Sequence, residues 1–204
     1  MLFSDSYFTI YQRGESIFKD RGSKFIGCAI PVSGPAEIRE QLLAIKKEHP
    51  SARHHCYAWR TGADKLTTRA NDDGEPSGSA GKPILNQIQS HDLTNILVVV
   101  TRYFGGTLLG VGGLINAYRE AASLAIKNSG IIEQFILFEY SVTFEFTMTS
   151  PVMKILKEFN AAIISQQCEE TNTIIFRVKK MDSEKLENKF RELYTTRLQF
   201  LKMI

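Results

Sequence analysis

A run of glycines constrains this chain more than any other feature of its sequence. Five of the nine residues from 105 to 113 are glycine, and the run comes shortly after the aliphatic stretch 96–100. Each glycine costs the folded state about 0.5–1 kcal/mol of backbone entropy relative to alanine. The cluster therefore needs a geometric reason. Either a strand and a helix approach each other closely here, or backbone N–H groups surround an anion at a helix N-terminus.

The run matches neither of two common phosphate-binding loops. It is not followed by the Gly-Lys-Ser/Thr of a P-loop, and Ile115 stands where a dinucleotide-binding fingerprint has its third glycine. We nevertheless predict a loop that faces phosphate, because the helix that follows supplies free N–H groups. The predicted phosphate- or nucleic-acid-binding residues are Gly105, Gly106, Gly110, Gly112, Gly113, Arg53, His54, Lys82, Arg102 and Arg119. Arg102 and Arg119 are expected to flank the loop.

A second unusual segment is the acidic turn around residues 71–83. A calcium loop is excluded, because Arg69 stands where its first aspartate belongs when Gly74 is aligned as the sixth position. Asp72, Asp73 and Glu75 are candidate acid/base or ligand-contacting residues. The alternative is a solvated turn whose side chains satisfy nearby backbone groups. No residue is assigned as catalytic.

No metal site or cofactor is expected. His54 and His55 fall on a predicted strand, so their side chains point to opposite faces and cannot readily bind one metal ion. One of the two is expected to reach the acidic turn, since consecutive strands are often neighbours. The three cysteines are odd in number and far apart, which is typical of a reducing compartment.

Charge and hydropathy limit the class of protein. The net charge is only +3, with 15 basic and 13 acidic residues in 1–133 and 10 and 9 in 134–204, so no basic stripe argues for a dedicated nucleic-acid binder. The N-terminus lacks the pattern of a signal peptide. The longest aliphatic run is five residues, far too short for a membrane span. We expect a cytoplasmic protein without membrane contact.

The second half of the chain has the clearer pattern. Hydrophobic residues alternate over 140–146, which predicts a strand, and a helix follows with Thr149 or Ser150 as its cap and Pro151 as its first residue. Strands at 161–168 and 173–178 flank a turn at 169–172. Asp182 is expected to cap a second helix, and a strand closes the chain at 198–203. This βαββαβ order is the ferredoxin-like pattern.

The first half mixes strands and helices over about 130 residues, an α+β pattern. Strands are predicted at 16–19, 24–31, 54–60, 65–71 and 95–103, and helices at 34–48, 83–90 and 114–128. The last helix presents one apolar face, made of Leu114, Ala117, Tyr118, Ala121 and Ala125. The predicted domains are 1–133 and 134–204.

Several motifs together resemble the IMPACT family, of the bacterial YigZ/YvyE type. They are the segments 21–25, 52–58, 72–81, 102–106 and 109–114, which read RGSKF, ARHHCYA, DDGEPSGSAG, RYFGG and LGVGGL. The resemblance covers nearly the whole chain. It implies an N-terminal βα domain similar to domain IV of elongation factor G and to the GHMP kinases. It also implies a ferredoxin-like C-terminal domain similar to domain V of the same factor.

The resemblance favours one function over another without deciding between them. Eukaryotic members restrain a kinase of translation initiation, but they bind its activator through an additional N-terminal RWD domain, so that activity is not expected here. The first hypothesis is a non-enzymatic factor that binds RNA or ribosomes, or translation-related proteins, and modulates translation. The alternative is an enzyme acting on a phosphorylated small molecule or nucleotide through Asp72, Asp73 or Glu75. A purely protein-binding module is a third possibility.

Overall fold

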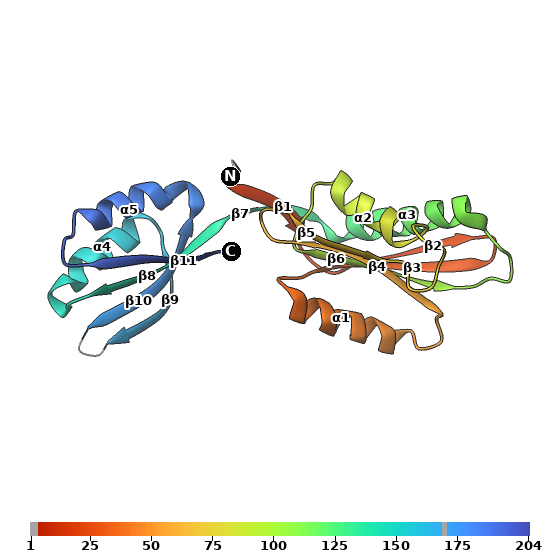
Figure 1. The fold of residues 1–204 in the computed structure, drawn as a ribbon, viewed down its shortest axis with the longest axis horizontal. Coiled ribbons are helices and arrows are strands. Elements are labelled where there is room, and N and C mark those ends of the chain that lie inside the picture. The colour runs from red at the N-terminus through yellow and green to blue at the C-terminus, as the bar shows by residue number, and fades with distance from the viewer. Residues whose placement is uncertain (1–3, 169–170) are drawn as a thin grey trace. The chain divides into compact units, whose positions relative to one another are not determined.

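The structure is a computed structural model that describes residues 4–168 and 171–204. Contacts between Cα atoms divide the chain into two compact units. One unit is Tyr7–Gln134, and the other is Phe135–Ile204 together with the N-terminal residues up to Ser6. Figure 1 shows the elements of both units. We describe each unit separately.

The first unit is built on a five-stranded antiparallel sheet. The strand order is β2-β3-β6-β4-β5, with bounds β2 Gly14–Asp20, β3 Ser23–Pro31, β6 Ile96–Tyr103, β4 His54–Thr61 and β5 Thr67–Asn71. Helix α1 (Pro35–Glu48) covers one face, and α2 (Gly81–Ser90) and α3 (Gly110–Ser129) cover the other (Figure 1). Because both faces are covered, seven of the eight residues of β6 are buried.

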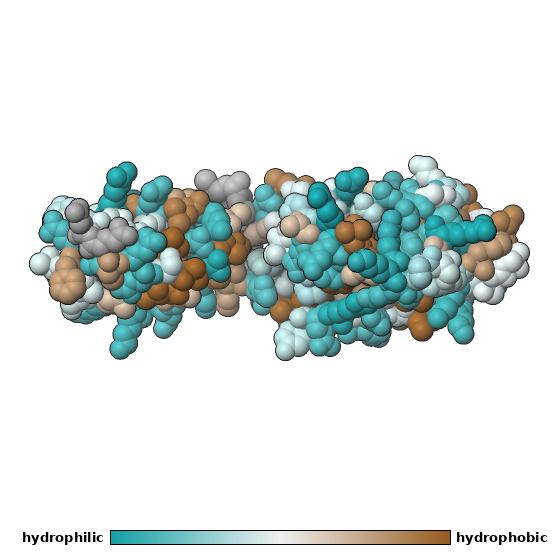
Figure 2. Space-filling view, turned by 90° about the horizontal axis from the view of Figure 1, so that it is seen from below, coloured by the Kyte–Doolittle hydropathy of each residue, from teal (hydrophilic) through white to brown (hydrophobic). Residues whose placement is uncertain are grey.

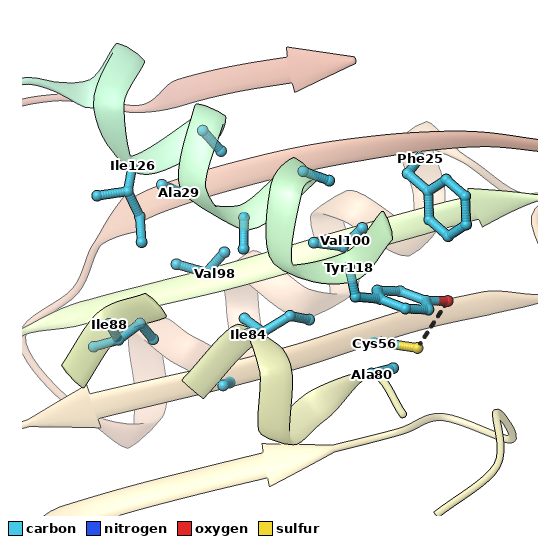
Figure 3. Close-up of a cluster of buried hydrophobic side chains, with 14 of the residues drawn as sticks. Phe25, Ala29, Cys56, Ala80, Ile84, Ile88, Val98, Val100, Tyr118 and Ile126 are labelled. Carbon is cyan, nitrogen blue, oxygen red and sulfur yellow. Dashed lines mark hydrogen bonds between the residues drawn. The ribbon is translucent and has the colours of Figure 1, made fainter. Parts of the chain in front are cut away.

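The main core of this unit lies between the sheet and helices α2 and α3. Figure 3 shows Phe25, Val98 and Val100 of the sheet facing Ile84 of α2 and Tyr118 of α3. All five residues of the predicted apolar face of α3 are buried, which confirms the helical periodicity. The opposite side of the unit, seen in Figure 2, is mostly hydrophilic with scattered hydrophobic residues.

The start of α3 differs from the prediction. The sequence predicted a helix from residue 114 after a glycine loop, but α3 begins at Gly110, so Gly110, Gly112 and Gly113 form its first turn. Glycine inside a helix costs about 1 kcal/mol relative to alanine. Burial of Leu109 and Leu114 on either side of this turn offsets that cost. Two further strands, β1 (Ser6–Ile10) and β7 (Ile131–Phe135), pair as a separate sheet, and the sequence did not predict β1.

The second unit has the predicted βαββαβ order. It consists of β8 Leu137–Phe144, α4 Thr149–Glu158, β9 Ala162–Cys168, β10 Asn172–Lys179, α5 Ser183–Arg191 and β11 Arg197–Met203. The strands form an antiparallel sheet in the order β11-β8-β10-β9. Val142, Phe144 and Phe176 of the sheet pack in one core with Leu156 of α4 and Phe190 of α5.

Local predictions in this unit were wrong at three points. The strand ends at Phe144, and Phe146 lies in a 3₁₀ turn (Phe146–Met148) with 82% of its surface exposed. Helix α4 begins at Thr149, so Pro151 is its third residue, and the Thr149 hydroxyl donates to the Phe146 carbonyl instead of capping the helix. Asp182 does precede α5 but makes no capping hydrogen bond. Glu169 and Glu170 of the predicted turn lie outside the described residues.

Candidate functional site

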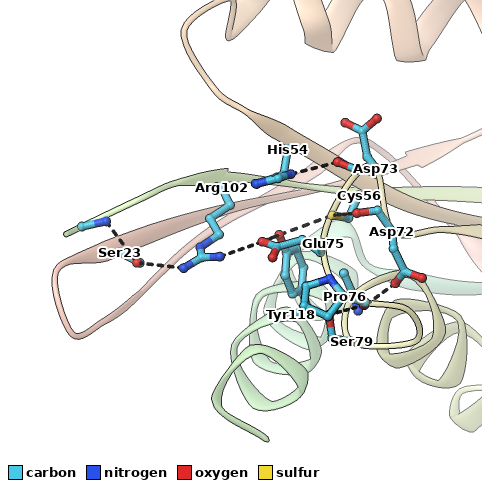
Figure 4. A network of polar contacts seen from close by, with 12 residues as sticks. Ser23, His54, Cys56, Asp72, Asp73, Glu75, Pro76, Ser79, Arg102 and Tyr118 are labelled. Atoms are coloured by element: carbon cyan, nitrogen blue, oxygen red, sulfur yellow. Dashed lines mark hydrogen bonds and ion pairs between the residues drawn. The ribbon is translucent and has the colours of Figure 1, made fainter. Parts of the chain in front are cut away.

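Segments that are far apart in the sequence meet at one end of the five-stranded sheet. In the antiparallel registers, Lys24 of β3 pairs with Tyr103 of β6, and His54 of β4 pairs with Arg102 of β6. The beginnings of β3 and β4 therefore flank the end of β6. The turn between β5 and α2 approaches the same place, as Figure 4 shows. Four of the five motifs that carry the family resemblance thus contribute to one polar network.

An ion pair between Arg102 and Glu75 is the centre of this network. The Nη1 atom of Arg102 donates to Oε1 of Glu75 at 2.8 Å, and their side chains are only 7% and 4% exposed. The Tyr118 hydroxyl donates to the same carboxylate oxygen at 2.8 Å. The guanidinium carbon also lies 5.5 Å from the centres of the Phe25 and Phe104 rings. Removing one partner of such a buried pair typically costs about 3–5 kcal/mol.

The remaining contacts of Arg102 are weaker. Its Nη2 atom lies 3.5 Å from the Ser23 hydroxyl, which in turn accepts a hydrogen bond from the backbone N–H of Gly105 at 3.2 Å. Among the described residues, Nε of Arg102 has no hydrogen-bond partner although it is buried. The free-energy cost of burying the Arg102 charge is therefore offset chiefly by its ion pair with Glu75.

Asp72 holds the acidic turn together. Its carboxylate accepts hydrogen bonds from the backbone N–H groups of Gly78, Ala80 and Gly81, at 2.8–3.0 Å. Burial alone would raise the pKa of Asp72, but these three donors hold it below its usual value. Because Ala80 and Gly81 stand at the start of α2, Asp72 also satisfies N–H groups that have no partner inside the helix.

Asp73 ties the acidic turn to β4. Its Oδ2 atom accepts the backbone N–H of His55 at 2.7 Å, and its backbone carbonyl lies 2.8 Å from Nδ1 of His54. The His54 side chain makes the hydrogen bond to the turn, and Nδ1 of His55 also lies 3.8 Å from Oδ2 of Asp73, so both histidines lie near Asp73. The Nε2 atom of His55 contacts the His49 carbonyl at 3.2 Å, and burial lowers the pKa of His55.

All three candidate carboxylates therefore have partners within the protein. Glu75 binds Arg102 and Tyr118, Asp72 binds backbone N–H groups, and Asp73 binds a backbone N–H. In the described part of the chain, no three His, Cys, Asp or Glu side chains are grouped so that they could hold a metal ion. Asp72 and Asp73 bind nearby backbone groups, as expected for a turn that its own side chains hold together. Glu75 differs, because it makes a long-range contact to Arg102.

Sequence reasoning missed three members of the network, Ser23, Cys56 and Tyr118. The Cys56 thiol donates to the Asp72 carbonyl at 3.0 Å and lies 3.3 Å from the Tyr118 hydroxyl. Burial raises the pKa of Cys56 to about 12 and also raises that of Tyr118, so both stay protonated at neutral pH. Ser23 and Cys56 lie inside the motif segments 21–25 and 52–58, so the motifs gave a signal for both residues. The pattern around Tyr118 indicated only a residue of the hydrophobic core.

The glycine segment faces solvent along most of its length. Every residue from 104 to 112 is exposed except Leu109. Gly106 and Gly110 have positive φ angles of 86° and 70°. A Cβ atom added to either of them, or to Gly112, would meet no other atom within 4 Å. Gly105 is different, because its Cβ would lie 1.9 Å from the carbonyl carbon of Gly22. One glycine therefore serves close packing, and three keep the backbone open.

The N-terminus of α3 lies within this segment and has no side-chain cap. Leu109 makes no capping hydrogen bond through its side chain, and the first turn of the helix contains no acidic residue. The first four N–H groups of a helix have no partner inside it. Together with the helix dipole, they favour negative charge at this end. An anion-binding helix end must be exposed and must lack a carboxylate. The N-terminus of α3 meets both conditions.

The predicted cations are placed less favourably than expected. Arg102 is bound to Glu75, and Arg119 donates to Glu120 at 3.3 Å and also contacts Asn116. Arg119 lies nine residues into α3 from Gly110, roughly 14 Å along the helix axis. Both guanidinium groups are therefore engaged with carboxylates. Arg53 precedes β4 and Lys82 lies in the first turn of α2, and both are exposed.

A cation that the sequence analysis overlooked lies nearer to the glycine segment. Arg21 is exposed and stands in the β2–β3 turn beside Gly22, whose backbone packs against Gly105. Arg21 belongs to the motif 21–25, which is the sequence signal that points to it. A separate cavity of about 580 Å³ lies beside Cys28 and Glu48 at the end of α1, and its lining contains none of the predicted site residues.

Comparison with known proteins identifies the family. The sequence pattern described as "Impact N-terminal domain" matches residues 21–126. The chain belongs to the IMPACT family. It is 38% identical to IMPACT family member YvyE of Bacillus subtilis over 153 residues, which cover 75% of this chain and 70% of that one. It is 36% identical to IMPACT family member YigZ of Escherichia coli over 145 residues, which cover 70% and 71%.

More distant members match over a shorter range. Protein IMPACT-B of Xenopus tropicalis is 36% identical over 111 residues, which cover 52% of this chain and 34% of the Xenopus protein. A solved structure entitled "Crystal structure of an hypothetical protein" superposes with a TM-score of 0.78 at 27% identity and covers 98% of this IMPACT family chain and 99% of its own. The whole mixed α/β architecture is therefore shared with a solved structure. In the described residues, none of the helices has the length and apolar character needed to cross a bilayer.

Proposed function

We propose that this IMPACT family protein is a non-enzymatic cytoplasmic factor that binds RNA or ribosomes and modulates translation. The observation that carries the proposal is the exposed, uncapped and acid-free N-terminus of α3. Backbone N–H groups at such a helix end bind phosphate oxygens. The family resemblance implies domains similar to domains IV and V of elongation factor G, and this expectation, together with the role of eukaryotic family members in translation, supports the same function.

Phosphate binding is proposed to combine the helix end with nearby basic side chains. Gly106, Gly110 and Gly112 allow a phosphate to approach the backbone, because no side chain covers them. Arg21 supplies a positive charge from the adjoining turn. Arg53 and Lys82 are proposed as outer contacts, and Arg102 is proposed to support the Gly105 turn through Ser23. The modest charge of +3 agrees with a small number of phosphate contacts.

The alternative, an enzyme that uses Asp72, Asp73 or Glu75, receives less support. A general acid or a metal ligand must offer a free oxygen to the substrate. Asp72 accepts hydrogen bonds on both of its oxygens, and Glu75 accepts two on Oε1 with a side chain that is only 4% exposed, so neither carboxylate is readily reached by a substrate. Calorimetric titration with ATP and with Mg²⁺ tests this alternative, and saturable binding of either that Asp72→Asn or Glu75→Gln abolishes would favour it.

The proposed function is tested by titrating RNA and ribosomes at two salt concentrations. We expect binding at low salt that weakens as salt rises, with a slope of about 0.7 per phosphate contacted on a single strand. The substitution Val111→Glu places a carboxylate in the first turn of α3 and should weaken binding about fivefold. Arg21→Gln should reduce the salt slope by about one contact.

The matched control is Leu66→Glu, which also replaces an exposed apolar residue by glutamate. Leu66 is 80% exposed and Val111 is 54% exposed, and Leu66 precedes β5 at the opposite end of the sheet. Its effect on binding should be negligible. Absence of binding at low salt, or equal effects of Val111→Glu and Leu66→Glu, would reject the proposal.

A further inference from the structure

A groove in the second unit has no role in the site described above. It lies between helix α5 and the edge strand β11, both labelled in Figure 1, and encloses a cavity of about 490 Å³. Sites for small organic groups typically measure about 300–1,000 Å³ and combine an apolar floor with a few polar groups. The lining of this groove has that composition, with Tyr140, Phe190 and Phe200 as the aromatic part and Glu187, Arg191 and Arg197 as the charged part.

The floor of the groove offers an aromatic ring to solvent. Phe200 is 48% exposed, although its ring packs edge-on against Tyr140 with the two centres 5.6 Å apart. A second edge-on contact joins Phe200 to Phe138 at 5.1 Å. The ring is therefore fixed by its neighbours while about half of the residue stays uncovered. A fixed and partly uncovered ring is a platform on which another flat ring can stack.

The rim of the groove carries more positive than negative groups. Glu187 accepts the Tyr140 hydroxyl at 2.7 Å through Oε1, and its Oε2 atom lies 3.7 Å from Nη2 of Arg191, whose Nη1 atom donates to Oδ1 of Asn188 at 2.9 Å. Arg197 is exposed, and within residues 4–168 and 171–204 no hydrogen bond or ion pair engages its guanidinium. Two guanidinium groups and one carboxylate leave a net charge of +1 at the rim. The groove thus favours a flat ring that carries negative charge.

We propose that the α5–β11 groove binds one nucleotide of single-stranded RNA, with its base stacked on Phe200 and its phosphate at Arg197. Bases stack on exposed aromatic rings irrespective of sequence, and guanidinium groups pair with phosphate oxygens. The inference rests on the proposed RNA-binding function and names a second contact for it. This contact is independent of the α3 helix end.

The test measures binding of the full chain to a fluorescein-labelled single-stranded RNA of about ten nucleotides by fluorescence anisotropy. Phe200→Leu keeps the groove apolar but removes the ring, and should weaken binding about fivefold to tenfold. Arg197→Gln should weaken binding about threefold and lower the salt slope by about one contact. Free AMP should compete only weakly, because it lacks the neighbouring phosphates of a strand.

Matched controls separate loss of the site from loss of the fold. Phe146→Leu removes an aromatic ring that is 82% exposed in the same unit, and Lys154→Gln removes an exposed charge from α4. Both should bind RNA as the unaltered chain does. Circular dichroism checks that Phe200→Leu is folded. If Phe200→Leu is unstable, Arg197→Gln still tests the site, because the Arg197 side chain is exposed and its replacement should not disturb the fold.

The outcomes distinguish the two proposals. If the unaltered chain binds no RNA at low salt, the proposed function and this inference both fail. If it binds RNA but Phe200→Leu and Arg197→Gln bind equally well, only the groove is excluded. If ultraviolet cross-links to the RNA map to the β11 segment and disappear in Phe200→Leu, the groove is supported. Cross-links confined to residues 105–113 would overturn it.

Discussion

Two ion-pair networks, one in each unit, show how the surroundings decide what a salt bridge does. In the first unit, Arg102 and Glu75 are nearly inaccessible to water. In the second, Glu139 binds Arg177 at 2.8 Å and Lys202 at 3.5 Å; the Glu139 side chain is itself only 9% exposed, but these two basic side chains are 33% and 60% exposed. Water therefore reaches the cations of the second network but hardly reaches either partner of the first. We expect the pair with two inaccessible partners to contribute more to stability than the network in which only the carboxylate is inaccessible.

The two sheets are covered by helices to different extents, and this explains why water reaches one ion-pair network more than the other. Helices cover both faces of the five-stranded sheet, and the polar network lies where strand ends, a turn and α3 close over it. The four-stranded sheet packs its core with α4 and α5, whereas every residue of its edge strand β9 is exposed. In the view of Figure 2, hydrophobic side chains gather on one side of this second unit but are scattered on the first.

The largest expected effect breaks the buried pair. Glu75→Gln keeps the shape of the side chain but leaves the Arg102 charge without a counter-charge, and should lower the free energy of unfolding by about 3 kcal/mol. Urea denaturation followed by the fluorescence of Trp59 measures it, because this single tryptophan lies in β4 of the first unit.

The matched variant in the second unit is Glu139→Gln. The hydrogen bond from Arg177 lowers the pKa of Glu139, which is itself nearly inaccessible, but Arg177 and Lys202 reach solvent and can be hydrated when the counter-charge is removed, so a smaller change is expected. Circular dichroism reports this unit, which lacks tryptophan. Equal destabilisation by the two substitutions would contradict the role of burial argued above.

Much of this architecture could be predicted from the sequence, for a physical reason. Periodicity is a local signal, so the apolar face of α3 and the βαββαβ order of the second unit were recognised. The partner of Glu75 was not, because Arg102 and Tyr118 lie 27 and 43 residues further along the chain. No local pattern shows which arginine a carboxylate will meet. The start of α3 was misplaced because burial of Leu109 and Leu114 outweighs the low helix propensity of glycine.

A second prediction compares two aspartates that precede helices. Asp72 binds the backbone N–H groups of Ala80 and Gly81 at the start of α2 and that of Gly78 in the preceding turn, whereas Asp182 precedes α5 without a capping hydrogen bond. Hydrogen bonds to a charged group contribute about 1.5–3 kcal/mol. Asp72→Asn should therefore cost about 2 kcal/mol at neutral pH, and Asp182→Asn should cost much less.

The pH dependence of the stability of the unaltered protein and of Asp72→Asn shows whether the charge of Asp72 causes the stabilisation. Because the pKa of Asp72 is lower in the folded protein than in the unfolded chain, its contribution is present above pH of about 4 and is lost as the pH falls further. The stability difference between the unaltered protein and Asp72→Asn should shrink on acidification. Urea midpoints at a series of pH values measure this, and a difference that stays constant with pH would show that the charge is irrelevant.

The smallest expected effect is that of Gly112→Ala, which is best compared with Gly105→Ala in the same segment. Gly105→Ala forces a methyl group against the Gly22 backbone and should cost about 1–3 kcal/mol, the usual penalty for overpacking. Gly112→Ala adds the same methyl group to an open position in the first turn of α3, where alanine favours the helix by about 1 kcal/mol. The two substitutions should therefore change stability in opposite directions. Thermal unfolding measures both.

If Gly112→Ala raises the melting temperature while weakening RNA binding, then this glycine is kept for access to the backbone and not for stability. If it changes neither quantity, the open backbone at this position has no part in binding.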